Sequence, residues 1–324
     1  MIGGKIALEE HFALAETLGD SERYFPPAVW QRMYSALTDI QEKRLAGMDQ
    51  HGIETAILSL NSPAIQGIHD TPRAIEVARV SNDFLAEQIA KNPARFQGFA
   101  ALPMQDPDAA ARELTRCVKE LGFRGALVNG FSQKDVLDSA VFYDIPQYEP
   151  FWATVEQLGV PFYLHPRDPL FSRQQHYEGH PWFVGPVWAF AVETSIHALR
   201  LMASGLFDRH PKLTIILGHL GEAIPFNIWR VDHRLRKDAR GMPAKKPLGE
   251  YLRENFYLTT SGNFRTQTLI DCMLEVGADR ILFSADYPFE NMGDAAEWFD
   301  HASISEPDRV KIGRTNAKKL FNLP

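Results

Sequence analysis

The chain has 324 residues, a formal net charge of −7 at pH 7 and two cysteines. The acidic balance and the absence of a basic run argue against a nucleic-acid partner. No apolar stretch approaches the ~20 residues that cross a bilayer, and the N-terminus carries no signal-peptide pattern, so we expect a cytoplasmic protein without a membrane partner. Cys117 and Cys272 lie in helical patterns and are expected to be buried thiols rather than a disulfide.

Short, continuously apolar runs alternate with longer helical patterns along the chain. The helical patterns, for example residues 74–91, 108–121 and 151–158, place apolar residues at i, i+3 and i+4. Strands that alternate with helices form parallel sheets, and about eight of them match an α/β protein with a distorted (β/α)8 TIM barrel. We expect a single domain over residues 1–324. The apolar runs begin at Lys5, Thr55, Phe96, Gly125, Pro161, Thr214, Phe256 and Ile281.

Two long segments interrupt this alternation. Residues 12–45 follow the first run and are rich in aromatic residues and proline, and residues 167–186 follow the fifth run. Long connections after barrel strands commonly carry function. We therefore expect the first segment to be a lid or a subunit contact.

Polar side chains end most of the predicted strands. The carboxyl ends of barrel strands meet on one face, where active sites are built. Glu9 and His11 are two residues apart, so on a strand they point to the same side, whereas Glu10 points to the other. The polar residues at the strand ends are Glu9, Glu10, His11, Asn61, Asn129, His165, His219, Ser261 and Asp286.

Four of these residues form a candidate metal site. Glu9, His11, His165 and Asp286 offer two imidazole nitrogens and two carboxylate oxygens. This mixture suits Zn²⁺ or Mn²⁺ and disfavours a thiolate site. Any one of them alone is more often a hydrogen-bonded loop residue, but four at three strand ends favour a metal. No Walker A or dinucleotide glycine pattern is present, so we expect no organic cofactor.

Two further groups leave alternatives open. Glu222 follows His219 by three residues, the spacing of a helical turn. This spacing would let the Glu222 carboxylate orient His219 as a catalytic base. The alternative is a helix N-terminus at which the dipole favours Glu222. Arg230 lies in a helical pattern. Its position is as consistent with binding an anion as with forming an ion pair on the protein surface.

Several long stretches spread over the chain match the sequence pattern of one known family. They include KIALEEHFAL, VPFYLHPR, IILGHLGE, TTSGNFRTQTLID and GADRILFSADYPFEN. On these stretches the chain resembles the amidohydrolase superfamily, specifically its decarboxylase branch. The resemblance implies an amidohydrolase-like barrel that binds a metal and a small aromatic acid. It places the metal on Glu9, His11, His165 and Asp286, a second layer on His219 and Glu222, and a substrate contact on Arg230.

The chain departs from the superfamily pattern at two positions. Many members open with His-x-His and bind two ions bridged by a modified lysine on the fourth strand. Here Glu9 replaces the first histidine and Asn129 ends the fourth strand, so we expect one divalent ion. The resemblance also implies a homo-oligomer, a tetramer or dimer, in which a loop closes a neighbour's site. The segment around Phe25 and Trp30 is the candidate for that loop.

The resemblance implies reversible, non-oxidative decarboxylation of a dihydroxybenzoate, with γ-resorcylate to resorcinol and CO₂ as the first expectation. The metal would chelate the substrate, and Asp286 would protonate the ring carbon with the help of His219 and Glu222. A related branch that acts on 2,3-dihydroxybenzoate can carry alanine in place of His11, so His11 favours γ-resorcylate. The alternatives are decarboxylation of 2,3-dihydroxybenzoate or salicylate, a metal-dependent lactone or amide hydrolase, and a binding scaffold without chemistry. The expected substrate-binding residues are Arg230, Asn129, Asn61 and Phe25.

Overall fold

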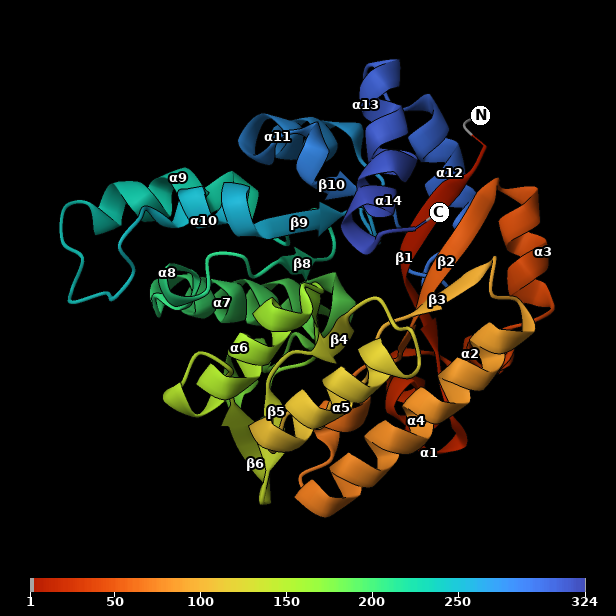
Figure 1. Cartoon of the computed structure of the whole chain (residues 1–324), viewed down its shortest axis with the longest axis horizontal. Coiled ribbons are helices and arrows are strands. Elements are labelled where there is room, and N and C mark those ends of the chain that lie inside the picture. The colour runs from red at the N-terminus through yellow and green to blue at the C-terminus, as the bar shows by residue number, and fades with distance from the viewer. Residues whose placement is uncertain (1–2, 324) are drawn as a thin grey trace.

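The computed structural model describes residues 3–323 and has a barrel of parallel strands at its centre (Figure 1). Each of the eight predicted apolar runs overlaps one of these strands, so that prediction is confirmed. The barrel strands are β1 (Lys5–Phe12), β2 (Ile53–Leu60), β3 (Phe96–Gly98), β4 (Ala126–Asn129), β7 (Phe162–His165), β8 (Ile215–Leu217), β9 (Phe256–Thr259) and β10 (Ile281–Leu282).

The barrel is assembled from two arcs of hydrogen-bonded strands. One arc has the order β1-β2-β3, and the other has the order β10-β9-β8-β7-β4. Single parallel bridges close the two seams, between Leu8 and Ser284 and between Ala100 and Ala126. The pairing of β1 with β2 shifts register between Ala7 and Glu10, which marks a β-bulge in β1. The predicted (β/α)8 barrel is therefore confirmed, with irregular seams.

Helices cover the outside of the barrel (Figure 1). Asp70 and Asp106 cap the first turns of two of them by accepting backbone N–H groups, and a proline follows each cap closely, as helix starts favour. The helices are α3 (Lys43–Gln50), α4 (Thr71–Lys91), α5 (Pro107–Lys119), α6 (Glu149–Leu158), α7 (Ala189–Ala203), α8 (Leu206–Arg209), α9 (Ile224–Leu235), α10 (Leu248–Asn255), α11 (Thr266–Val276), α12 (Met292–His301), α13 (Glu306–Val310) and α14 (Asn316–Phe321).

The two long segments are folded into short helices. Residues 12–45 contain α1 (Ala15–Leu18), η1 (Gly19–Tyr24) and α2 (Pro27–Thr38), in addition to the start of α3. Residues 167–186 are a chain of single turns, which are η4 (Phe171–Arg173), η5 (Gln175–Tyr177), η6 (Pro181–Phe183) and η7 (Gly185–Val187).

An antiparallel hairpin that we did not predict follows β4. It pairs β5 (Ser132–Lys134) with β6 (Val136–Val141). The remaining single turns are η2 (Ala64–Gly67), η3 (Pro146–Tyr148), η8 (Ala278–Arg280) and η9 (Lys311–Thr315). Within residues 3–323, no helix is both long and apolar enough to cross a membrane. Cys117 and Cys272 are buried free thiols, as expected.

The inside of the barrel is apolar at one end and polar at the other. Ile6, Leu8, Ile57 and other strand residues fill the amino-terminal part, where Phe321 of α14 packs edge-on against Phe99. The buried side chains toward the carboxyl ends are Glu9, His11, His165 and Ser261. The apolar layer closes one end of the barrel, so the polar groups gather at the other end, where barrel enzymes hold their sites.

Candidate metal centre

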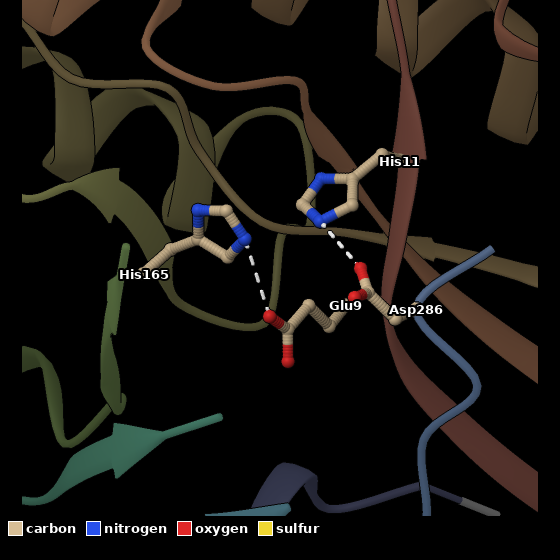
Figure 2. A group of neighbouring side chains, drawn as sticks. All are labelled: Glu9, His11, His165 and Asp286. Atoms are coloured by element: carbon tan, nitrogen blue, oxygen red, sulfur yellow. Dashed lines mark ion pairs between the residues drawn. The ribbon is translucent and has the colours of Figure 1, made fainter. Parts of the chain in front are cut away.

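The four predicted metal ligands meet at the carboxyl ends of three strands. One ligand atom from each of Glu9, His11, His165 and Asp286 lies within 4.8 Å of the others. Nε2 of His165 is 3.2 Å from Oε1 of Glu9, and Nε2 of His11 is 3.4 Å from Oδ1 of Asp286 (Figure 2). Ligand atoms placed about 2.1 Å from a divalent ion lie roughly 3 Å or slightly more apart, so both spacings suit one shared ion.

The hydrogen bonding of the cluster also fits a metal. Oε1 of Glu9, Nε2 of His11 and Oδ1 of Asp286 are buried, and none of them has a hydrogen-bond partner among the described residues. Buried polar atoms without a partner are costly, and ligation to a cation removes that cost. Oγ of Ser59 lies 3.2 Å from Nδ1 of His11 and orients the ring with Nε2 toward the cluster.

Backbone strain helps to aim these side chains. Glu9, His219, Glu222 and Asp286 all have positive φ angles, of 56°, 51°, 58° and 69°. Residues other than glycine rarely adopt this conformation, and it concentrates at functional sites where the surrounding fold enforces it. Four residues of one site sharing it indicates that the loops are shaped for side-chain placement.

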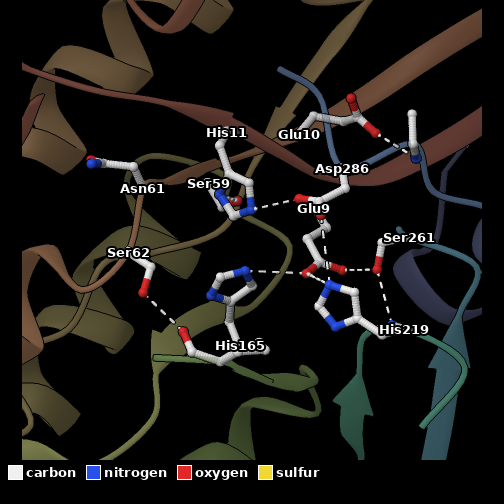
Figure 3. A network of polar contacts seen from close by, with 12 residues as sticks. Glu9, Glu10, His11, Ser59, Asn61, Ser62, His165, His219, Ser261 and Asp286 are labelled. Carbon is white, nitrogen blue, oxygen red and sulfur yellow. Dashed lines mark hydrogen bonds and ion pairs between the residues drawn. The ribbon is translucent and has the colours of Figure 1, made fainter. Parts of the chain in front are cut away.

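His219 adjoins the cluster and is held by Glu222. Its Nδ1 donates to Oε1 of Glu222 at 2.8 Å. Its Nε2 lies 3.6 Å from both Oε1 of Glu9 and Oδ2 of Asp286 (Figure 3). Burial disfavours the charged ring, but Glu222 and Glu9 raise the pKa of His219 well above its ordinary value. Burial also disfavours the Glu9 carboxylate, yet His219, His165 and His11 hold its pKa well below the usual range.

Glu10, on the opposite face of β1, and Arg44 of α3 are both fully buried. The Glu10 carboxylate accepts the backbone N–H of Ala285 at 3.0 Å, and Arg44 donates to the backbone oxygen of His11. The Arg44 guanidinium lies 4.7 Å from the ring centre of Tyr287. Burial raises the pKa of Glu10 to about 8. This pair joins the backbone that carries His11 to the backbone that carries Asp286.

Among the described residues of the site, Asp286 and His219 reach solvent most. The side chains of Glu9 and His11 are fully buried, whereas those of Asp286 and His219 are 12% and 24% exposed. A reactant therefore approaches from the side of Asp286 and His219. The Phe289 ring lies 5.4 Å from that of His11, and Phe25 stacks on Phe289 at 6.2 Å with an interplanar angle of 5°. Phe25 also lines a cavity of about 930 Å³ with residues of the 167–186 segment.

Comparison with known proteins identifies the family. The family model described as amidohydrolase matches residues 26–323. The chain belongs to the amidohydrolase family. The gamma-resorcylate decarboxylase of Rhodococcus jostii (strain RHA1) is 62% identical over 325 residues, which cover 99% of each chain.

Two solved structures have a closely similar backbone. A 2,6-dihydroxybenzoate decarboxylase complexed with 2,6-dihydroxybenzoate is 61% identical, with a TM-score of 0.98 over 99% of this chain and 100% of that one. A dihydroxybenzoic acid decarboxylase from Polaromonas sp. JS666, with bound manganese and the inhibitor 2-nitroresorcinol, is 62% identical, with a TM-score of 0.97 over 99% of this chain and 97% of that one.

Two predicted substrate-binding residues of this amidohydrolase are buried beside the site. The side-chain amide of Asn129 donates to the backbone oxygens of Asn61 and Pro63, and that of Asn61 donates to Thr17 and Ser21. Both amide nitrogens are thus engaged in hydrogen bonds within the protein. Both Oδ1 atoms are buried without a partner among the described residues. Only these oxygens are left to accept a hydrogen bond from a ligand.

The other two predicted contacts lie in different surroundings. Phe25 is near the site of its own chain through Phe289. Arg230 is exposed on α9 and lines a surface cavity with Arg234 and Arg240, which are not residues of the metal cluster. The structure therefore does not bring Arg230 together with the four ligands, and its contact with substrate stays a prediction.

Sequence reasoning missed several residues of the site. Phe289, Ser59 and Arg44 each touch His11. Ser59 lies on β2, two residues before Asn61, which directly follows the strand, so the two-residue period of a strand could have predicted Ser59 at the site. Arg44 and Phe289 reach His11 from a separate helix and a separate loop, and no local pattern signals either contact.

Proposed function

We propose that this amidohydrolase is a metal-dependent carboxy-lyase that converts γ-resorcylate reversibly into resorcinol and CO₂. The observation that carries the proposal is the cluster of Glu9, His11, His165 and Asp286, whose partly exposed side is flanked by His219. The relatives that are 62% identical over the full chain act, by their names, on the same acid, and a neighbouring structure holds 2,6-dihydroxybenzoate.

The centre is proposed to hold one divalent ion, Mn²⁺ or Zn²⁺, and no organic cofactor. When bound, the ion supplies positive charge that holds the carboxylate of the substrate and the adjacent ring oxygen. The manganese in the Polaromonas structure supports Mn²⁺. The position of the bridging lysine is taken by Asn129, whose amide nitrogen is already committed to the backbone, and this supports a single ion.

Asp286 is proposed to donate the proton that replaces CO₂. Its two oxygens have separate surroundings, since Oδ1 faces His11 and the cluster while Oδ2 faces Nε2 of His219. The proton adds to the ring carbon that bears the carboxylate, the bond between that carbon and the carboxylate breaks, and its electron pair restores the aromatic ring. His219, oriented by Glu222, then returns a proton from solvent to Asp286.

The remaining predicted residues are proposed to bind the substrate ring. Phe25 and Phe289 offer stacked aromatic faces beside His11, and aromatic rings pair well in such arrangements. The Oδ1 atoms of Asn61 and Asn129 are proposed to accept from ring hydroxyls, and Arg230 is proposed to hold a substrate oxygen.

We also propose that the protein is a cytoplasmic homo-oligomer, a tetramer or dimer. Large apolar side chains are exposed at several places, and two groups of them support subunit contacts. These side chains are Phe171, Trp182, Phe183, Val187 and Trp188 in one group and Phe226 and Trp229 in the other.

The test is an anaerobic assay of Mn²⁺-loaded protein with γ-resorcylate in D₂O. The expected product is resorcinol with deuterium at the carbon between the two hydroxyls. 2,3-Dihydroxybenzoate, salicylate and a panel of lactones and amides are assayed in parallel. An absolute requirement for oxygen, or hydrolysis of a lactone without turnover of any ortho-hydroxybenzoate, would overturn the proposal.

A further inference from the structure

The two oxygens of the Glu9 carboxylate have opposite surroundings. Oε1 faces Nε2 of His165 at 3.2 Å and has no hydrogen-bond partner among the described residues. Oε2 faces a group of three hydroxyls inside the barrel. The carboxylate is fully buried, so this division decides which oxygen is available to an ion.

The three hydroxyls belong to Tyr163, Thr259 and Ser261. Tyr163 and Ser261 each donate to Oε2 of Glu9, and Oγ1 of Thr259 lies 3.3 Å from the same oxygen. Thr259 also lies 2.8 Å from the hydroxyl of Tyr163 and 2.9 Å from that of Ser261. All three side chains are fully buried, so water does not compete for these bonds.

A count of donors and acceptors shows that Oε2 is saturated. Each hydroxyl has one proton, and a carboxylate oxygen accepts about two hydrogen bonds. Tyr163 and Ser261 fill both positions on Oε2. The single proton of Thr259 then goes to one of three nearby acceptors, which are Oε2 of Glu9 and the hydroxyl oxygens of Tyr163 and Ser261. Burial and the Glu9 charge raise the pKa of Tyr163 well above its ordinary value, so it stays a neutral donor.

One of the three hydroxyls, that of Ser261, also contacts His219. Oγ of Ser261 accepts the backbone N–H of His219 at 3.1 Å while it donates to Glu9 (Figure 3). There is little free space around this contact, because a Cβ added to Gly218 would lie 2.9 Å from Oε2 of Glu9 and 3.2 Å from Oγ of Ser261. The position of Glu9 is thus linked to that of His219 through one serine.

The pattern follows from strand periodicity. Tyr163 is two residues before His165 on β7, and Thr259 is two residues before Ser261 at the end of β9. Alternate residues of a barrel strand face the interior, so each strand places one residue in the layer below the cluster. A histidine as first ligand would need one partner for its second ring nitrogen, whereas a buried carboxylate needs several donors for its second oxygen.

We propose that Tyr163, Thr259 and Ser261 are positioning residues that fix Glu9 with Oε1 toward the cluster and thereby set the affinity of the centre for its divalent ion. This inference rests on the proposed metal centre. Partners that orient a metal ligand typically change metal affinity by 10–100-fold when they are removed. A role in barrel stability alone would lower the melting temperature and leave the affinity of the folded protein unchanged.

The experiment measures Mn²⁺ affinity of folded, chelator-treated protein by competition with a metal-binding dye and by the electron paramagnetic resonance signal of free Mn²⁺. We expect Tyr163→Phe to weaken Mn²⁺ binding by about tenfold or more. Tyr143→Phe is the matched control, because Tyr143 is also fully buried and its hydroxyl bonds to Ser132 away from the cluster. It removes the same atom and should leave the affinity unchanged.

A second pair of variants keeps the inference testable if Tyr163→Phe does not fold. Thr259→Val removes the hydroxyl at constant shape and should weaken Mn²⁺ binding, whereas Thr259→Ser keeps the hydroxyl and should retain it. Wild-type affinity in folded Tyr163→Phe or Thr259→Val would overturn this inference and leave the proposed function standing. A wild-type protein that binds neither Mn²⁺ nor Zn²⁺ would overturn the metal centre itself and this inference with it.

Discussion

Oδ2 of Asp286 lies 3.6 Å from Nε2 of His219, on the partly exposed side of the cluster. Since Oδ1 of the same carboxylate faces His11, one side chain connects the candidate metal cluster to the imidazole that Glu222 orients. This arrangement separates two tasks. In the proposed mechanism, Asp286 would ligate the ion and protonate the reacting carbon. His219 would supply Asp286 with protons without being one of the four ligands.

Asp286→Asn removes the proposed proton donor and a negative ligand. We expect kcat for γ-resorcylate to fall by about 10²–10⁴-fold even at saturating Mn²⁺, which is the usual contribution of a general acid. The measurement is resorcinol formation in D₂O, with Asp279→Asn as the control, because Asp279 pairs with Lys311 on the surface. Activity within threefold of the wild type would exclude Asp286 as the donor.

His219→Asn separates proton supply from metal binding. We expect kcat to fall by about 10²–10³-fold while the Mn²⁺ content stays the same, because the four ligand side chains are intact. Glu222→Gln should cause a smaller loss, since the amide still accepts from Nδ1 of His219 but without charge. Elemental analysis of both purified variants checks the occupancy, and loss of the metal from His219→Asn would reassign His219 as a ligand.

The barrel and the gathering of the four candidate ligands could be predicted because both depend on local patterns. Each strand is an apolar run. A residue at the carboxyl end of a strand must lie on the carboxyl-terminal face of the barrel once the barrel closes. Glu9 and His11 were assigned to one side from their spacing, and both do face the cluster although β1 has a bulge there. The interior side chains Ile6 and Leu8 would by strict alternation be followed inward by Glu10, and the shift in pairing between Ala7 and Glu10 turns Glu9 and His11 inward instead.

Features that depend on distant contacts could not be predicted. The bonds from Tyr163 and Ser261 to Glu9 span 154 and 252 residues, and they require the closed barrel and its register. Helix α2 was missed because its Pro-Pro start suggests a loop, although proline at the first helical position is favoured. The β5–β6 hairpin turns at Asp135, which has a φ angle of 64°, and its exposed Val136 and Leu137 resemble no buried strand.

His165→Ala tests the metal site through stability as well as activity. The variant keeps the apolar barrel layer and should fold, but we expect loss of bound Mn²⁺ and of activity. An ion that binds only the folded state adds about 2.7 kcal/mol at a concentration 100 times its Kd. Added Mn²⁺ should therefore raise the melting temperature of the wild type and not that of the variant. An equal rise in both proteins would remove His165 from the ligand set.

The last prediction concerns His197, which is fully buried in α7, away from the cluster. The Tyr143 backbone N–H is 3.4 Å from its Nε2, the Phe142 ring packs edge-on against it, and burial, with a smaller contribution from Arg200, lowers its pKa from 6.5 to about 3. Between pH 6.5 and about 3, His197 is therefore mostly neutral in the folded protein and mostly protonated in the unfolded chain. Stability from this group is complete above pH 6.5 and is lost as the pH falls from 6.5 toward 3.

At pH 5 the unfolded state gains about 2 kcal/mol from protonation of His197, at 1.36 kcal/mol for each pH unit below 6.5. His197→Gln keeps an acceptor and removes the titration. The free energy of unfolding, measured with urea at pH 8, gives the packing cost of the substitution alone. Between pH 8 and pH 5 the wild type should lose about 2 kcal/mol more than the variant does. Parallel pH profiles for the two proteins would show that His197 is as easily protonated in the folded state as in the unfolded chain.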